Sequence, residues 1–189
     1  MLTGGSSRRM GTDKALLEVG GRALSQRVAS ALRAAGADRV VAIGGDIGGL
    51  RALGLDVVVD QHPGEGPLGG ILTALDATTE AVVVVLACDL PGADPVAITA
   101  VVDALGEADV AAPLHDGRHE LLHAAYHRRA QPVLATAFAA GERAVHRACR
   151  ELTVASVTGV GPAALADVDT PADLGPASTD GNGGGMGSG

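Results

Sequence analysis

The chain has 189 residues and a mass of 18.6 kDa, and 47% of its residues are hydrophobic, which suits one domain with a single packed core. Only 1% of the residues are aromatic, and the formal net charge is −8. This composition argues against a nucleic-acid binder, because such proteins present a basic surface and often stack bases on exposed rings. Any phosphate that the protein binds must be met by a local group of cations.

Two cysteines, Cys88 and Cys149, lie far apart without a CxxC pair, so neither a disulfide framework nor a structural zinc site is indicated. We expect both thiols to be inert, and we expect Cys88 to pack as a small apolar residue. The N-terminus lacks the apolar stretch of a signal peptide, and no run reaches the ~18 apolar residues of a membrane span. These features predict a cytoplasmic protein without membrane contact.

Short apolar runs alternate with segments of helical periodicity, a pattern typical of α/β proteins with βαβ units and a mostly parallel sheet. Residues 82–86 are apolar throughout, as expected of a central parallel strand that is buried on both faces. The other expected elements are strands at 40–43, 57–59 and 110–112, a helix over 24–35 that ends at Gly36, and a helix that Asp94 caps and Pro95 begins.

The two ends of the chain differ from a regular α/β domain. A full strand normally precedes the first glycine loop, but only residues 1–3 are available here. Either the first strand is short or the true start of the protein lies upstream of Met1. Residues 175–189 are rich in Gly and Ser and have little to bury, so we expect a domain over 1–174 and a disordered tail.

The segment 2–14 concentrates glycines, hydroxyls and cations between the first strand and a helix. Gly4 and Gly5 let backbone N–H groups approach an anion, and three side chains can neutralise it: Arg8, Arg9 and Lys14. The segment fits neither the Walker A loop nor the dinucleotide-binding fingerprint. The alternative interpretation is a glycine turn followed by solvated basic residues.

This segment resembles the L-[AT]-G-G-x-S-x-R-M-G-x-D-K signature of nucleotidyltransferases that use a nucleoside triphosphate. Its Arg-Met-Gly-x-Asp-Lys form is similar to the molybdenum cofactor guanylyltransferases in particular. Later segments agree with that family in order and spacing: Asp60, Gly66-Pro67-Leu68-Gly69-Gly70, Cys88-Asp89-Leu90-Pro91, Gly141-Glu142-Arg143 and Asp167-Val168-Asp169-Thr170-Pro171. The resemblance covers residues 2–174 and implies a Rossmann-like, three-layer αβα fold.

Asp89 follows the most apolar strand at its carboxyl end, where open α/β sheets bind their ligands. A carboxylate there can bind Mg²⁺, although it could also only cap a turn before Pro91. The resemblance implies that Asp89 carries a catalytic Mg²⁺ and that Lys14 binds the triphosphate. Arg9 is the third catalytic candidate, because its charge can neutralise the triphosphate or the incoming phosphate. Asp169 stands where the family often has Asn and is a candidate second metal ligand.

The reaction that the resemblance implies is transfer of GMP from GTP to molybdopterin, with release of pyrophosphate and formation of the guanine dinucleotide cofactor. GTP and molybdopterin are then the small-molecule partners, and molybdoenzymes or other proteins of cofactor biosynthesis are the protein partners to expect. The predicted nucleotide-binding residues are Leu2, Thr3, Gly4, Gly5, Lys14, Gly44, Asp60, Gly66, Pro67 and Asp89.

The turn after the strand at 40–43 departs from the family, which often has a nucleotide-contacting Asn there. This chain has Gly44, Gly45 and Asp46 instead, so base recognition would fall to backbone groups of the two glycines. Related reactions therefore remain open: transfer from CTP to molybdopterin, or from GTP to phospholactate. A regulatory nucleotide-binding module is a further class, against which the intact Lys14 and Asp89 argue.

A second motif points to different chemistry. The run His119-Glu120-Leu121-Leu122-His123 fits the H-E-x-x-H pattern of zinc hydrolases, and His115 and His127 extend it at intervals of four. That chemistry requires a helix, but Pro113 and Asp116-Gly117 favour a turn immediately before the motif. We therefore predict a strand on the acceptor side, with surface or structural histidines, some of which line the pterin pocket if the resemblance holds.

Overall fold

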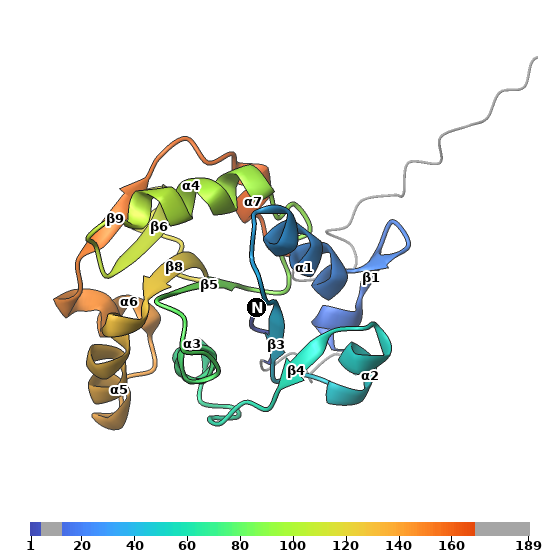
Figure 1. Cartoon of the computed structure of the whole chain (residues 1–189), viewed down its shortest axis with the longest axis horizontal. Helices are drawn as coiled ribbons and strands as arrows, with labels where there is room; N and C mark the ends of the chain where they lie inside the picture. Colours follow the sequence, from blue (N-terminus) through green and yellow to red (C-terminus); the bar gives the residue numbers. More distant parts are fainter. Residues whose placement is uncertain (5–12, 169–189) are drawn as a thin grey trace, which may run out of the picture.

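The computed structural model describes residues 1–4 and 13–168 (Figure 1). Its helices are α1 (Leu24–Ala34), α2 (Ile47–Ala52), α3 (Pro67–Asp76), α4 (Pro95–Leu105), α5 (Gln131–Ala139), α6 (Val145–Ala148) and α7 (Pro162–Leu165), with short 3-10 helices η2 (Lys14–Leu16), η3 (Arg128–Ala130) and η4 (Cys149–Glu151). Its strands are β1 (Glu18–Val19), β2 (Arg22–Ala23), β3 (Val41–Ile43), β4 (Asp56–Val58), β5 (Val82–Leu86), β6 (Val110–His115), β7 (Arg118–His119), β8 (His123–His127) and β9 (Val154–Val157). Four predicted site residues lie outside the described residues, as do the predicted domain end and tail: Gly5, Arg8, Arg9 and Asp169.

The central sheet is mostly parallel. β3 pairs in parallel with β4, and Leu2 bridges β3 to the end of β5. β8 then lies antiparallel between β5 and β6, and β9 adds in parallel to β6. Because β5 and β6 are both antiparallel to β8, they run in the same direction. The predicted α/β class with a mostly parallel sheet is therefore confirmed, with β8 reversed inside it.

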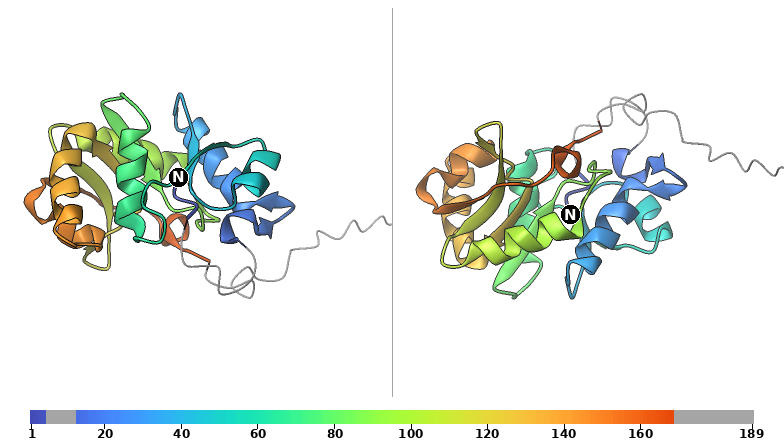
Figure 2. Two further views of the ribbon diagram at one scale, coloured as in Figure 1. Left: turned by 90° about the horizontal axis from the view of Figure 1, so that it is seen from below. Right: turned by 90° about the horizontal axis from the view of Figure 1, so that it is seen from above.

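Helices cover both faces of this sheet. In Figure 1, α1 and α4 lie above the sheet, and α3 and α5 lie below it. The two perpendicular views agree, since α3 and α5 are in front when seen from below, and α1 and α4 when seen from above (Figure 2). The predicted three-layer αβα arrangement is thus confirmed. Within the described ranges, the helices are too short or too polar to cross a membrane.

The central strands are buried on both faces. Val85 of β5 packs into the core on the side of α3, whereas its neighbour Leu86 packs into the core on the side of α1 and α4. In β3, Ile43 packs on the side of α3 and Ala42 packs on the side of α1 and α4. Because successive residues of a strand point to opposite faces, a strand in such a place must be apolar at every position. This explains the uninterrupted apolar run at 82–86.

The first strand is short but central. Leu2 forms parallel bridges to Ile43 on one side and to Ala87 on the other. Its N–H donates to the carbonyl of Leu86 at 2.8 Å, and the N–H of Cys88 donates to the carbonyl of Leu2 at 3.1 Å. The N-terminus accordingly lies between β3 and β5 (Figure 1). A few residues therefore join the two halves of the sheet.

The H-E-x-x-H motif lies in a β-hairpin and not on a helix. β6 turns at Asp116 and Gly117, both with positive φ, into β7, and residues 120–122 form a second turn before β8. His119 ends β7, while His123 begins β8. The zinc-hydrolase alternative is therefore wrong, because its ligands require one turn of helix between them. The predicted strand is confirmed at β8, but the turn at 120–122 interrupts it.

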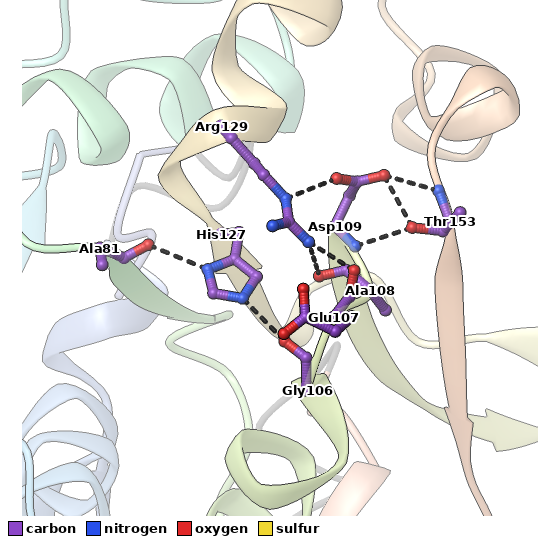
Figure 3. Close-up of polar contacts among 8 residues, drawn as sticks. All are labelled: Ala81, Gly106, Glu107, Ala108, Asp109, His127, Arg129 and Thr153. Atoms are coloured by element: carbon purple, nitrogen blue, oxygen red, sulfur yellow. Dashed lines mark hydrogen bonds and ion pairs between the residues drawn. The ribbon is translucent and has the colours of Figure 1, made fainter.

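A polar cluster joins β6, β9 and η3 at the amino end of β6 (Figure 3). The carboxylate of Asp109 accepts hydrogen bonds from Thr153 N at 2.9 Å, from Thr153 Oγ1 at 2.7 Å and from Arg129 Nε at 3.0 Å. These bonds, chiefly the one from the Thr153 backbone, hold the pKa of Asp109 below its usual range. His127 closes the cluster, with Nε2 at 3.0 Å from the carbonyl of Gly106. This cluster fixes the edge of the sheet opposite to Asp89.

Candidate active site

Lys14 and Asp89 meet at the carboxyl end of β5. The Nζ atom of Lys14 lies 3.8 Å from Oδ2 of Asp89, and the two side chains are 17% and 23% exposed. Lys14 begins η2, whereas Asp89 lies three residues after Leu86, the last residue of β5. Lys14 is also the only lysine in the sequence. The fold thus brings together a cation and a carboxylate that are distant in sequence and that both retain access to solvent.

Asp13 fixes the position of Lys14, a role that the sequence motifs alone do not assign. Its Oδ1 accepts a hydrogen bond from Ala15 N at 3.0 Å, which caps η2. Its Oδ2 accepts from Asp46 N at 2.7 Å, which ties η2 to the turn after β3. Aspartate is favoured immediately before a helical turn, and this preference is the sequence signal from which the capping role of Asp13 could have been predicted. Asp13 therefore acts on Lys14 through the backbone that carries it.

The turn after β3 requires glycine at two positions. Gly44 and Gly45 have φ values of 72° and 77°, in the left-handed region. A Cβ on Gly45 would lie 2.9 Å from the carbonyl oxygen of Thr3 and 3.0 Å from Oδ2 of Asp13. A Cβ on Gly44 would lie 3.2 Å from Cβ of Asp60. The absence of side chains lets this turn, the first strand and Asp60 pack in direct contact.

The first glycine segment uses its backbone donors within the sheet. The N–H of Leu2 donates to Leu86, and the N–H groups of Thr3 and Gly4 both donate to the carbonyl of Ile43 at 3.0 Å. The buried Thr3 hydroxyl lies 2.9 Å from the carbonyl oxygens of Ile43 and Gly44 and donates to this pair. The carbonyl of Leu2 accepts from the N–H of Cys88, so a backbone contact of this segment with a nucleotide would use the carbonyls of Thr3 and Gly4. The predicted role of residues 2–4 in nucleotide binding stays a prediction.

Asp60 lies next to the same glycines. Its Oδ1 accepts hydrogen bonds from His62 N at 2.9 Å and from Thr73 Oγ1 at 3.1 Å. Its Oδ2 lies 3.7 Å from the place where Gly4 would carry a Cβ, so this oxygen faces the glycine segment. The loop and α3 thus orient the carboxylate toward the predicted nucleotide site.

Gly66 and Pro67 open α3 behind the Asp60 loop. Gly66 has a φ of 83° and Pro67 is the first helical residue, an arrangement in which proline loses no hydrogen bond. Gly69 lies in the first turn, where a Cβ would lie 2.7 Å from Cβ of His62. These glycines let the helix approach the loop closely. The predicted contact of Gly66 and Pro67 with a nucleotide stays a prediction.

A pocket of about 500 Å³ lies beside Asp89. Its walls come from the end of β5, from the β6–β8 hairpin and from α7, and its polar lining is Asp89, His115, Glu120, His123 and Asp167. The N–H of Val168 donates to the carbonyl of Asp89 at 3.0 Å. This bond holds the C-terminal segment against the end of β5 and explains how Asp167 reaches the pocket.

The histidines of the hairpin divide between this pocket and other contacts. His115 and His123 line the pocket. Nε2 of His119 lies 2.8 Å from the hydroxyl of Ser156, and His127 belongs to the polar cluster of Asp109. His115 and His123 are therefore the candidates for contact with a ligand, and the other two have structural partners.

Both cysteines are buried, which confirms the predicted packing of Cys88. Burial, assisted by the negative charges of Asp89 and Asp13, raises the pKa of the Cys88 thiol to about 12. Burial raises the pKa of Cys149 to about 11. Because the thiolate is the reactive form, these shifts support the prediction that neither cysteine takes part in chemistry.

The carboxylate beside Lys14 suits magnesium. Over residues 1–4 and 13–168, no three or more His, Cys, Asp or Glu side chains are grouped to hold a metal ion. Mg²⁺ does not require such a cage, because it usually keeps several waters and binds one or two carboxylates together with substrate phosphates. Asp89 is a partly exposed carboxylate at a pocket that also contains Asp167. This donor set fits Mg²⁺ carried in with a nucleotide.

Comparison with known sequences identifies relatives. Residues 1–156 match the family model of the MobA-like NTP transferase domain. A probable molybdenum cofactor guanylyltransferase of Pelotomaculum thermopropionicum is 43% identical over 126 residues, which cover 67% of this chain and 61% of that protein. The molybdenum cofactor guanylyltransferase of Pseudomonas putida is 33% identical over 151 residues, which cover 78% of this chain and 79% of that protein. The chain thus spans less than two thirds of the length of the first relative.

Solved structures with the same fold include nucleotidyltransferases. Molybdopterin-guanine dinucleotide biosynthesis protein A from Archaeoglobus fulgidus superposes with a TM-score of 0.72 and 26% identity, and the match covers 92% of both chains. The 2-C-methyl-D-erythritol 4-phosphate cytidylyltransferase from Thermus thermophilus superposes with a TM-score of 0.70 over 92% of this chain and 93% of that one. At 20% identity the second likeness supports the fold alone.

Proposed function

The chain belongs to the family of MobA-like NTP transferases, and from this premise we propose that it transfers GMP from GTP to molybdopterin and releases pyrophosphate. The observation that carries the proposal is the approach of Lys14 to Asp89 at the carboxyl end of β5. The relatives named molybdenum cofactor guanylyltransferase support the choice of substrates. The product would pass to molybdoenzymes or to other proteins of cofactor biosynthesis.

The proposed reaction is a single in-line displacement. A terminal phosphate oxygen of molybdopterin attacks the α-phosphorus of GTP, a new P–O bond forms, and the α–β phosphoanhydride bond breaks to release pyrophosphate. Positioning and neutralisation of charge carry most of the catalysis in such reactions. Lys14 would neutralise the triphosphate, and Arg9 is a second candidate for this role. Neither acid–base residues nor a covalent intermediate are needed.

Asp89 would hold the magnesium ion, with Asp169 as the candidate second ligand. When bound, Mg²⁺ withdraws charge from the triphosphate oxygens and makes pyrophosphate a better leaving group. Asp89 contributes the carboxylate, and the hydrogen bond from Val168 N to its carbonyl holds Val168 at the carboxyl end of β5. Lys14 lies beside the same carboxylate, so the cation and the metal ligand can act on one triphosphate.

We place base recognition at the turn after β3. The N–H of Gly44 donates to Val58 at 3.0 Å and its carbonyl accepts from Thr3, so its own polar groups are in use. The N–H of Asp46 is bound by Asp13. Gly45 lies between them and is the residue whose backbone we propose to contact guanine. Recognition through a glycine backbone also explains why the family's Asn is not needed here.

The test is incubation of the purified protein with Mg²⁺, molybdopterin and each nucleoside triphosphate in turn, followed by pyrophosphate detection and mass measurement of the product. GTP alone should support turnover and add one guanylyl group. Equal turnover with CTP would replace this proposal with a cytidylyltransferase. Turnover with phospholactate but not with molybdopterin would identify the other acceptor, and no product with any pair would refute the transfer activity.

A further inference from the structure

One buried side chain in the pocket beside Asp89 lacks a hydrogen-bond partner among residues 1–4 and 13–168. His123, the first residue of β8, is 2% exposed. Both of its ring nitrogens are buried without a hydrogen-bond partner in the described structure. It lines the pocket that also contains Asp89. Buried polar groups in folded proteins are nearly always paired, so this imidazole calls for a partner that is not among the described residues.

The charges around the pocket limit what that partner can be. Three carboxylates line it, Asp89, Glu120 and Asp167, and neither Lys nor Arg is among its described lining residues. Burial lowers the pKa of His123 to about 4, even though the carboxylate of Asp94 opposes the shift. The ring is therefore neutral near pH 7 and offers one N–H donor and one nitrogen acceptor. An anionic group would be repelled here, whereas an uncharged group with both a donor and an acceptor is matched.

The size and walls of the pocket agree with a heterocycle. Its volume of about 500 Å³ is in the range of small-molecule sites. Leu90, Leu122 and Leu165 supply apolar surface for the faces of a flat ring. The phosphate of the same ligand would lie at Lys14, whose Nζ is 3.8 Å from Oδ2 of Asp89 and which is not among the lining residues of the pocket. A ligand with an uncharged ring at one end and a phosphate at the other therefore fits both parts of the site.

We propose that His123 binds the uncharged ring edge of the acceptor, a pterin-like heterocycle, and so determines acceptor affinity and orientation. This inference rests on the proposed function for the identity of the acceptor. One ring nitrogen of His123 accepts from a ring N–H of the ligand or donates to a ring carbonyl or nitrogen, while Lys14 engages the phosphate end. His123 takes no part in binding GTP. The turn at 120–122 serves this role, since it places His123 at the start of β8 and at the pocket.

The experiment compares His123→Leu, which removes the hydrogen bond to the ligand, with His123→Gln, which retains a donor and an acceptor. His119→Leu is the matched control, because His119 lies in the same hairpin outside the pocket. We expect His123→Leu to raise the KM for molybdopterin about 10-fold, the effect of one hydrogen bond, with an unchanged KM for GTP. His123→Gln should recover most of this loss. Urea midpoints should show that His123→Leu is no less stable than the wild type.

A second readout does not depend on turnover. Titration with free pterin, followed by its fluorescence, should show binding to the wild type and to His119→Leu, and about 10-fold weaker binding to His123→Leu. If pterin binds in this way but no guanylyl transfer occurs, the proposed function fails and the pocket assignment stands. Absence of pterin binding to the wild type, or equal affinity in His123→Leu, would overturn the inference. Parallel increases in the KM for GTP and for molybdopterin would overturn it as well.

Discussion

Replacement of Gly45 by alanine tests the packing of the nucleotide turn. At a φ of 77° an alanine costs about 1–2 kcal/mol relative to glycine. Its Cβ would also lie 2.9 Å from a backbone oxygen of Thr3, and relief of such overpacking typically costs about 1–3 kcal/mol. Gly54→Ala is the matched control, because its φ is 76° and nothing lies within 4 Å of the added Cβ. Gly45→Ala should therefore lower the free energy of unfolding by about 2–5 kcal/mol, and Gly54→Ala by about 1–2 kcal/mol.

Urea unfolding of the two variants measures the difference directly, and steady-state kinetics show its consequence. Because the added Cβ also meets Oδ2 of Asp13, we expect Gly45→Ala to displace Lys14 and to raise the KM for GTP. Gly54→Ala should leave the KM for GTP unchanged. Equal losses of stability in the two variants would show that the close approach of Thr3 and Asp13 to Gly45 does not exist in solution.

Three further predictions concern single groups. Burial lowers the pKa of His123 to about 4 in the folded protein, below its ordinary value near 6.5. The unfolded chain therefore takes up a proton first as the pH falls. The free energy of unfolding should be highest above about pH 6.5 and should fall by about 3 kcal/mol as the pH drops to 4. Urea midpoints across this range should show a smaller fall in His123→Gln, and an identical fall would contradict the burial of a neutral ring. Asp109→Asn should lower stability by about 1–2 kcal/mol in the same assay without changing the KM for GTP, because the cluster lies at the opposite edge of the sheet. Acylation of Lys14, the only lysine in the sequence, can be followed by mass spectrometry. With Mg²⁺ and GTP at about ten times its Kd, the rate of acylation should fall about 10-fold, because bound GTP protects the side chain. An acylation rate that GTP does not change would exclude Lys14 from the nucleotide site.

The elements that sequence predicts well are those whose local signals agree with their burial. The apolar run at 82–86 becomes β5, and Asp94 caps α4 through a 2.9 Å hydrogen bond from Val96 N. The proximity of Lys14 and Asp89 could also be predicted from the sequence, since parallel strands present their carboxyl ends at one edge of the sheet. In these cases short-range preference and long-range packing favour the same structure.

Other features depend on contacts that no local pattern encodes. The sequence of β8 mixes His, Ala and Tyr, and its antiparallel place between β5 and β6 follows from pairing partners that are distant in the chain. Assigning residues 119–126 to alternate faces of one strand also misses the turn at 120–122, where the N–H of His123 donates to the carbonyl of Glu120 at 2.9 Å. That turn decides that His123 is buried at the pocket. The link from Asp13 to Asp46 likewise requires the folded turn after β3.

The proposed reaction is tested most directly by the rate of pyrophosphate release from GTP and molybdopterin by the wild type, by Asp89→Asn and by the surface control Asp103→Asn. Loss of the metal-binding carboxylate should reduce kcat/KM by about 100-fold or more, the size expected when a group that stabilises transition-state charge is removed. Asp103→Asn, an exposed position on α4, should match the wild type. Wild-type turnover in Asp89→Asn would contradict the placement of the transfer reaction at the carboxyl end of β5.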